Sequence, residues 1–139
     1  MTFRPLYREG RVLRLLDQRL LPGREVWLEI EKAPEVAVAI RDMAVRGAPA
    51  IGVAAAYGAA FALRSGAPAP ARERFDVARR LLAATRPTAV NLFAALNRMA
   101  GRFERDASGA DDAIEAALVA EADAIASEDI ESCRRIGRF

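Results

Sequence analysis

The sequence predicts a single α+β domain over residues 1–139, with a small antiparallel sheet of about three strands followed by a bundle of about five α-helices. Apolar and polar residues alternate before residue 31, which is typical of strands with one buried face. Beyond that point apolar residues recur every three or four positions, as on the buried side of a helix. The 139 residues suffice for one ordinary domain and are few for two. We therefore expect a β-rich segment over residues 1–31 and a helical segment over residues 32–139.

Turn residues divide the N-terminal segment into three short strands. Residues 3–8 and 11–16 flank Glu9-Gly10, where glycine permits the positive φ of a two-residue hairpin turn. Pro22-Gly23 predicts a second turn, after which residues 25–30 alternate between polar and apolar. These three strands are expected to form the antiparallel sheet.

Five stretches with helical spacing follow the strands. The predicted helices span residues 34–45, 49–63, 72–84, 89–105 and 110–136. The second is apolar nearly all round, which indicates a helix buried in the centre of the bundle. The last one carries acidic residues that we expect mostly on its solvent-exposed face: Glu115, Glu121, Asp123, Glu128, Asp129 and Glu131.

The composition excludes several kinds of chemistry. The sequence has no His, so no imidazole can act as a general base or a metal ligand. Its single Cys excludes an internal disulfide and a cysteine-only metal cluster, which fits a reducing compartment. No apolar run approaches the roughly 18 to 20 residues of a membrane span, and the N-terminus lacks the apolar core of a signal peptide. We expect a soluble cytoplasmic protein with no membrane partner.

The charge distribution gives no sign of a polyanionic partner. The net charge is only +2, and Lys32 is the sole lysine among the 21 basic residues. The densest basic stretch covers residues 134–138, and neither a basic stripe nor interleaved aromatic residues accompany it. We therefore do not expect nucleic-acid binding.

Residues 46–58, Arg-Gly-Ala-Pro-Ala-Ile-Gly-Val-Ala-Ala-Ala-Tyr-Gly, form the most informative stretch. Pro49 is tolerated at the first helical position because its missing N–H would have no acceptor there, and Gly47 and Ala48 keep the helix entrance free of bulky side chains. Free backbone amides and the positive end of the helix dipole, with Arg46 beside them, can hold a phosphate or a carboxylate. The alternative is that the small residues only pack a buried helix and that Arg46 is solvated.

Residues 85–92, Thr-Arg-Pro-Thr-Ala-Val-Asn-Leu, repeat this arrangement. Thr88 is a candidate N-cap, and Pro87 holds Arg86 in an extended conformation just before a helix start. Two arginines that each lie beside a helix N-terminus, Arg46 and Arg86, would form a clamp for one phosphoryl group. The alternative is that the segment is only a capping loop.

Two further residues carry reactive groups. Asp17, in the polar triplet Asp17-Gln18-Arg19, is a candidate catalytic carboxylate, but a pairing with an Arg or a role in tying down the hairpin is favoured. Cys133 precedes Arg134 and Arg135, whose cations would lower its pKa if they faced it. Adjacent helical residues point in different directions, which favours a packed structural Cys.

These segments together resemble the S-methyl-5-thioribose-1-phosphate isomerase family of methionine salvage, a route of amino-acid biosynthesis. The resemblance rests on residues 46–52, 54–58, 86–92 and 16–22, and on Glu128-Asp129 followed by Ile136-Gly137. It covers almost the whole chain, and the first motif is highly specific. The wider family includes ribose-1,5-bisphosphate isomerase and the regulatory subunits of initiation factor two-B, which usually carry weaker versions of the Asp-Gln-Arg and Arg-Pro-Thr segments.

The resemblance implies an aldose–ketose isomerase that converts 5-methylthioribose 1-phosphate to 5-methylthioribulose 1-phosphate without a metal or a redox cofactor. It implies that Arg46, Gly47, Ala48 and Arg86 bind the phosphate of this sugar phosphate, and that the full-length protein is a homodimer. The alternatives are a non-catalytic regulatory or interaction domain, as in initiation factor two-B, and a domain like that of ribose-1,5-bisphosphate isomerase.

The resemblance also implies that the chain is one part of a larger enzyme. In the family, the catalytic Cys and Asp lie in a C-terminal Rossmann-like domain, which would follow residue 139 and is absent here. We therefore expect no catalytic residue in this chain, which would be an N-terminal domain truncated before the second one and inactive alone. Cys133 does not match the catalytic Cys of the family.

Overall fold

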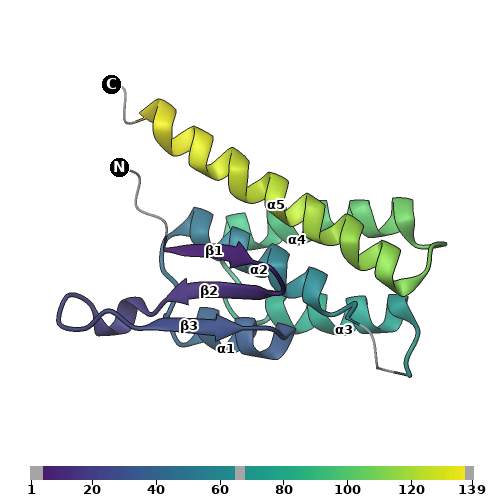
Figure 1. Ribbon diagram of the computed structural model, residues 1–139, viewed down its shortest axis with the longest axis horizontal. Helices are drawn as coiled ribbons and strands as arrows, with labels where there is room; N and C mark the ends of the chain where they lie inside the picture. Colours follow the sequence, from purple (N-terminus) through teal and green to yellow (C-terminus); the bar gives the residue numbers. More distant parts are fainter. Residues whose placement is uncertain (1–4, 65–67, 137–139) are drawn as a thin grey trace.

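The computed structural model describes residues 5–64 and 68–136, with side chains described as far as residue 132. The described residues form a three-stranded sheet followed by five α-helices, which confirms the predicted α+β fold (Figure 1). The strands are β1 (Leu6–Glu9), β2 (Val12–Leu16) and β3 (Trp27–Ile30). The helices are α1 (Ala33–Arg41), α2 (Ala48–Phe61), α3 (Ala71–Ala83), α4 (Val90–Asp106) and α5 (Asp111–Ile136). The side chains of Cys133 and of the basic stretch 134–138 lie outside what is described.

The sheet is antiparallel throughout, in the order β1-β2-β3. Glu9 lies opposite Val12, so Gly10 and Arg11 form the turn of the first hairpin, one position later than predicted. Gly10 has a φ of +61° and occupies the first central position, as glycine does in a type II′ turn. Leu13 and Leu15 are fully buried against the helices because alternate residues of β2 point to the same face.

Helix α2 is the buried centre of the bundle, as predicted. Every residue from 51 to 61 is buried, and the helices α1, α3, α4 and α5 all pack against it. Its high content of Ala and Gly permits close approach, most clearly at Gly52. A Cβ at Gly52 would lie 3.0 Å from the backbone oxygen of Asn91 in α4. Helix α5 runs alongside α4 and past the β1 edge of the sheet (Figure 1).

Helix α1 ends at Arg41, short of the predicted end at Val45. Met43 adopts a φ of +65°, and its amide and that of Ala44 donate to carbonyls of the last turn at 3.2 and 2.9 Å. This is the hydrogen-bond pattern of a Schellman motif, which usually has glycine where Met43 stands. The apolar periodicity was misleading because Ala44 and Val45 are buried although they lie beyond the helix.

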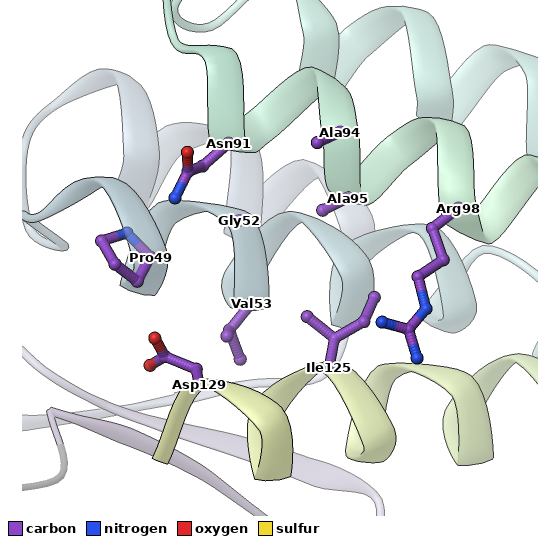
Figure 2. A pocket seen from close by; sticks show the side chains of 9 residues that line it. All are labelled: Pro49, Gly52, Val53, Asn91, Ala94, Ala95, Arg98, Ile125 and Asp129. Atoms are coloured by element: carbon purple, nitrogen blue, oxygen red, sulfur yellow. The ribbon is translucent and has the colours of Figure 1, made fainter. Parts of the chain in front are cut away.

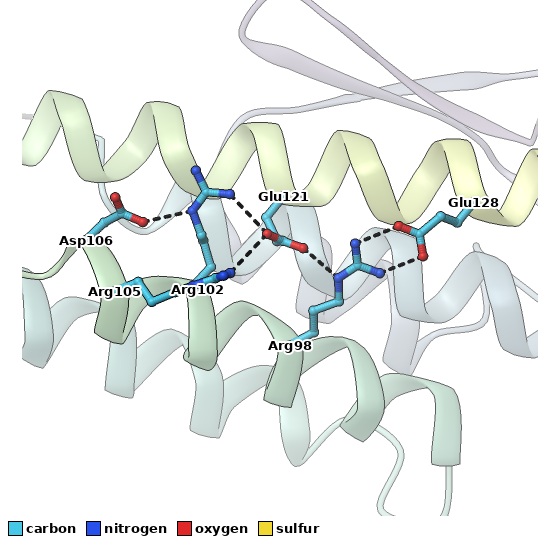
Figure 3. A network of polar contacts seen from close by, with 6 residues as sticks. All are labelled: Arg98, Arg102, Arg105, Asp106, Glu121 and Glu128. Carbon is cyan, nitrogen blue, oxygen red and sulfur yellow. Dashed lines mark hydrogen bonds and ion pairs between the residues drawn. The ribbon is translucent and has the colours of Figure 1, made fainter.

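One residue of the acidic face predicted for α5 is buried. Only 8% of Glu121 is exposed, and its two oxygens accept hydrogen bonds from Arg98 at 2.6 Å and Arg102 at 3.1 Å (Figure 3). The prediction of an exposed face is therefore wrong for Glu121, since α4 presents arginines to it. Glu128 accepts a bidentate pair from Arg98 and is exposed, as predicted.

A second polar contact fastens α5 to the sheet. The Asp123 carboxylate accepts two hydrogen bonds from Arg8 of β1, at 2.9 and 2.7 Å, and one from the Tyr57 hydroxyl of α2, at 2.6 Å. Burial by itself would raise the pKa of Asp123, but the hydrogen bonds from Arg8 and Tyr57 outweigh it and hold that pKa below its usual range. Burial and the hydrogen bond to Asp123 raise the pKa of Tyr57. The contact joins three elements that are distant in the sequence.

Candidate functional site: two neighbouring helix starts

Helix α2 begins at Ala48, directly after Gly47 at the N-cap. Gly47 has a φ of +91°, which side chains other than glycine's disfavour. The space beside its Cα is open, so the backbone conformation and not packing calls for glycine. The first helical hydrogen bond runs from the Ile51 amide to the Gly47 carbonyl at 3.0 Å. The amides of Ala48 and Ala50 therefore have no acceptor within the helix, and Gly47 and Ala48 are exposed to solvent.

Arg46, directly before this helix start, has an exposed side chain that makes no hydrogen bond or ion pair with any described residue. Arg86 is half-buried and is likewise without a partner in the part of the chain that the structure describes. Most arginines with described side chains do have an acceptor, the other exceptions being Arg24 and Arg80. Both arginines predicted to bind phosphate are thus free to pair with a ligand.

Helix α4 begins at Val90 with Ala89 as its N-cap, which has no capping side chain. The prediction that Thr88 caps this helix is wrong. Pro87 and Thr88 are instead the central residues of a turn that is closed by the Ala89 amide donating to the Arg86 carbonyl at 3.0 Å. Thr88 therefore lies one position too early to cap, and no described side chain accepts a hydrogen bond from the amides of the first turn.

The two helix starts lie next to each other. Gly52 in α2 touches the backbone of Asn91 in α4 as described above, and both helices begin at the same end of a pocket (Figure 2). The structure thus brings together the segments that follow Arg46 and Arg86. The positive ends of two helix dipoles point to one region of the surface.

The pocket at these helix starts has a volume of about 330 Å³. It is lined by Pro49, Gly52 and Val53 of α2, by Asn91, Ala94, Ala95 and Arg98 of α4, and by Ile125 and Asp129 of α5. The Asn91 amide and the Asp129 carboxylate lie at the Pro49 end of the pocket, and Arg98 lies at the other end (Figure 2).

Asp129 differs from the other charged group of the pocket. The Arg98 guanidinium is occupied by Glu121 and Glu128, whereas the Asp129 carboxylate makes no hydrogen bond or ion pair with any described residue. Burial raises the pKa of Asp129. The sequence assigns no binding role to Asn91, which it shows only within a motif, or to Asp129, which it places with the acidic residues expected mostly on the solvent-exposed face of the last helix. The signal in the sequence that could have pointed to them is a polar residue on a helix face that otherwise consists of small apolar residues.

Asp17 pairs with an arginine, as favoured. The Asp17 side chain is buried and accepts from Arg19 Nε at 2.9 Å, Nη2 at 2.7 Å and the Arg19 amide at 3.1 Å. These hydrogen bonds hold the pKa of Asp17 below its usual range. The neighbouring Gln18 amide donates to the Ala44 carbonyl at 2.9 Å, so the Asp17 turn contacts the loop that leads to Arg46.

The described residues offer neither a membrane span nor a metal site. None of the helices there combines the length and the apolar character that a bilayer span needs. In the same part of the chain, no group of three or more His, Cys, Asp or Glu side chains is placed to hold a metal ion.

The fold defines the class of the protein as an α+β domain in which a helical bundle with a buried central helix packs on a three-stranded antiparallel sheet. Residues 44–139 match the model of the initiation factor 2 subunit family. The chain belongs to that family.

Curated relatives within this family carry the name of an isomerase. The chain is 52% identical to the methylthioribose-1-phosphate isomerase of Syntrophotalea carbinolica, over 99% of this chain and 41% of that protein. It is 56% identical to the protein of the same name from Pseudomonas aeruginosa, over 91% of this chain and 35% of that protein. The chain thus spans about two fifths of the length of the relatives it matches.

Two solved structures have the same fold. The crystal structure of 5-methylthioribose 1-phosphate isomerase from Pyrococcus horikoshii matches with a TM-score of 0.85 and 41% identity, over 92% of this chain and 37% of that one. The translation initiation factor eIF-2B subunit delta from A. fulgidus matches with a TM-score of 0.84 and 35% identity, over 94% of this chain and 38% of that one. Isomerases and an initiation factor subunit therefore share this domain.

Proposed function

We propose that this chain is the phosphate-binding, N-terminal domain of an aldose–ketose isomerase that converts 5-methylthioribose 1-phosphate to 5-methylthioribulose 1-phosphate. The observation that carries the proposal is the uncapped start of α2, entered through Gly47 and flanked by the unpaired Arg46. The names of the relatives that are more than half identical to the chain supply the substrate.

Each proposed contact has a physical role. The first-turn amides of Ala48 and Ala50 donate to phosphate oxygens, and the helix dipole favours their negative charge. Arg46 and Arg86 approach from two neighbouring helix starts and supply charge-assisted hydrogen bonds. Small residues at the entrance of α2 let the phosphate reach the backbone.

The same proposal assigns the chemical step to groups outside residues 1–139. An aldose–ketose conversion moves hydrogen between C1 and C2 of the sugar, which requires a positioned acid or base. The chain holds the phosphate and by itself catalyses nothing. The full-length enzyme is a cytoplasmic homodimer of methionine salvage.

The likeness to an initiation factor subunit favours a second candidate, a regulatory domain that binds a sugar phosphate or a nucleotide without converting it. The fold does not separate the two candidates, since both solved structures match almost equally well. Titration of the chain with ribose 1-phosphate and with AMP separates them. The isomerase proposal expects ribose 1-phosphate to bind more tightly, and the regulatory candidate expects AMP to bind at least as well.

The phosphate site itself is tested by titrating the chain with inorganic phosphate, followed by amide chemical shifts. Arg46→Ala and Arg86→Ala are each expected to raise the Kd about ten- to a hundredfold, because a hydrogen bond to a charged group is worth about 1.5 to 3 kcal/mol. Arg24→Ala and Arg80→Ala are matched controls, since these arginines also have no partner among the described residues and belong to neither of the segments that lead into α2 and α4. Equal Kd values in all four variants would contradict the assignment.

A further inference from the structure

The pocket between α2, α4 and α5 adjoins the proposed phosphate site but is not part of it. We propose that it holds the hydroxyl-bearing part of a sugar phosphate, with Asp129 accepting hydrogen bonds from neighbouring hydroxyl groups and Asn91 orienting them. The inference rests on the proposed function and extends it to residues that bind the sugar itself.

The position of the pocket supports this division. Pro49 and Asn91, which line it, belong to the first turns of α2 and α4, the same turns whose free amides face the proposed phosphate. A ligand anchored there by its phosphate has its remaining atoms at the mouth of the pocket. The volume of about 330 Å³ lies at the lower end of the range for small-molecule sites and suits a pentose.

The lining of the pocket leaves space for a ligand and places two polar groups at one end of that space. Gly52, Ala94 and Ala95 contribute no bulky side chain. The two polar groups at the phosphate end, the Asn91 amide and the Asp129 carboxylate, come from different helices and lie at the same end of the pocket in Figure 2. Neither makes a hydrogen bond with a described residue.

The charge of the pocket selects the ligand. Its arginine, Arg98, already pairs with Glu121 and Glu128, whereas Asp129 is the charged lining residue that no described side chain pairs with. A partly buried carboxylate with no partner among the described residues favours a ligand with donors, because an unmet acceptor costs free energy. A vicinal diol supplies two donors to one carboxylate, and a bare phosphate supplies a second negative charge, which Asp129 repels.

This contrast gives the experiment, in which the chain and its Asp129→Asn variant are each titrated with inorganic phosphate, ribose 1-phosphate and 2-deoxyribose 1-phosphate. We expect the substitution to raise the Kd for ribose 1-phosphate about tenfold, because a charge-assisted hydrogen bond is lost. The Kd of this variant for inorganic phosphate should equal that of the wild type or be lower. The preference for ribose over deoxyribose phosphate should disappear.

Matched variants separate this inference from general effects. Asp112→Asn removes the same charge from the first turn of α5, at the other end of the helix, and should change none of the three Kd values. Asn91→Ala should weaken the binding of ribose 1-phosphate and leave the binding of inorganic phosphate unchanged. This variant keeps the test valid if Asp129→Asn does not fold. Circular dichroism establishes that each variant is folded.

The outcomes distinguish two failures. If the wild-type chain binds no phosphate at tens of millimolar, the proposed function fails and the inference fails with it. If phosphate binds and Asp129→Asn shifts all three Kd values in the same direction, the phosphate site stands and the sugar pocket is wrong. Unchanged selectivity between ribose and deoxyribose phosphate in that variant would also overturn the pocket assignment.

Discussion

Two nearby residues, Met43 and Gly47, hold positive φ on the path from α1 into α2. Gly47 suits its conformation because it has no Cβ. Met43 adopts a left-handed conformation at the C′ position of a Schellman motif, where its Cβ crowds the backbone at a cost of about 1 to 2 kcal/mol. The side chain is 44% exposed and offers little packing in return. The loop that precedes Arg46 therefore contains one residue that fits its conformation poorly.

This misfit predicts that Met43→Gly stabilises the chain. We expect the free energy of unfolding to rise by about 0.5 to 1 kcal/mol, because the relief of strain exceeds the extra entropy that glycine loses on folding. Urea unfolding followed by circular dichroism measures it. Met43→Ala is the matched control, since it removes the same side chain but keeps Cβ, and it should give no gain. A gain of equal size in both variants would mean that the exposed side chain, and not the backbone, carries the strain.

Among the elements, the contact of α2 with α4 determines whether the two helix starts can meet. Gly52 and Gly101 both lie inside helices, where replacement by Ala ordinarily gains up to about 1 kcal/mol. Gly101 has open space where a Cβ would be, whereas the Cβ at Gly52 would lie 3.0 Å from the Asn91 carbonyl oxygen. That oxygen belongs to the backbone of α4 and cannot move alone.

We therefore expect opposite results from two identical substitutions. Gly101→Ala should raise the free energy of unfolding by about 0.5 to 1 kcal/mol and leave phosphate binding unchanged. Gly52→Ala should give no such gain and should weaken the binding of inorganic phosphate, because it pushes the starts of α2 and α4 apart. Denaturant unfolding and a phosphate titration of both variants measure these effects. Equal stabilisation with intact binding in Gly52→Ala would show that the close contact does not matter.

The elements were predictable from the sequence wherever the signal was local. Strand alternation and helical periodicity gave the element order, and the Pro and Gly at the α2 entrance marked a helix start beside Arg46. Thr88 was misassigned because the choice between a turn residue and an N-cap depends on a hydrogen bond of the Arg86 turn that the residue types do not encode. The phosphate-binding role of Arg46 and Arg86 remains a prediction.

What the sequence could not supply depends on contacts between elements far apart in the chain. Glu121 looked like part of an exposed acidic face, and only the packing of α4 on α5 places it against Arg98. The pocket around Asp129 likewise exists only where three helices meet. Periodicity indicates which face of a helix is apolar, but it does not show which charged neighbour reaches that face.

In the molecule as a whole, paired carboxylates add polar contacts between elements that also share the apolar core. Asp123 links β1, α2 and α5, and Asp17 holds the turn that contacts the loop before α2. Glu121 links α4 to α5. Each of these three carboxyls has its pKa held below its ordinary value. Folding therefore favours their charged forms, and the stability of the whole chain depends on them.

The lowered pKa values of these carboxyls predict how the stability of the chain changes at low pH. The hydrogen bond from Arg98 is the main cause of the lowered pKa of Glu121. Its contribution is complete above the pKa of a Glu in the unfolded chain, about 4.3, and is lost as the pH falls through the lower folded value. The free energy of unfolding should therefore be steady from pH 7 to about 5 and fall below about pH 4.

Glu121→Gln tests this at a single carboxyl. It should lower the free energy of unfolding at pH 7 by about 1 to 3 kcal/mol, because the buried arginine contacts lose their charged acceptor. It should also make the fall below pH 4 shallower than in the wild type, as measured by urea unfolding across the pH range. Glu128→Gln removes the same charge from the same arginine, but the Glu128 side chain is 61% exposed and water screens it, so its pH profile should follow the wild type. If the two variants have the same profile, the burial of Glu121 between α4 and α5 does not set the acid stability of the fold.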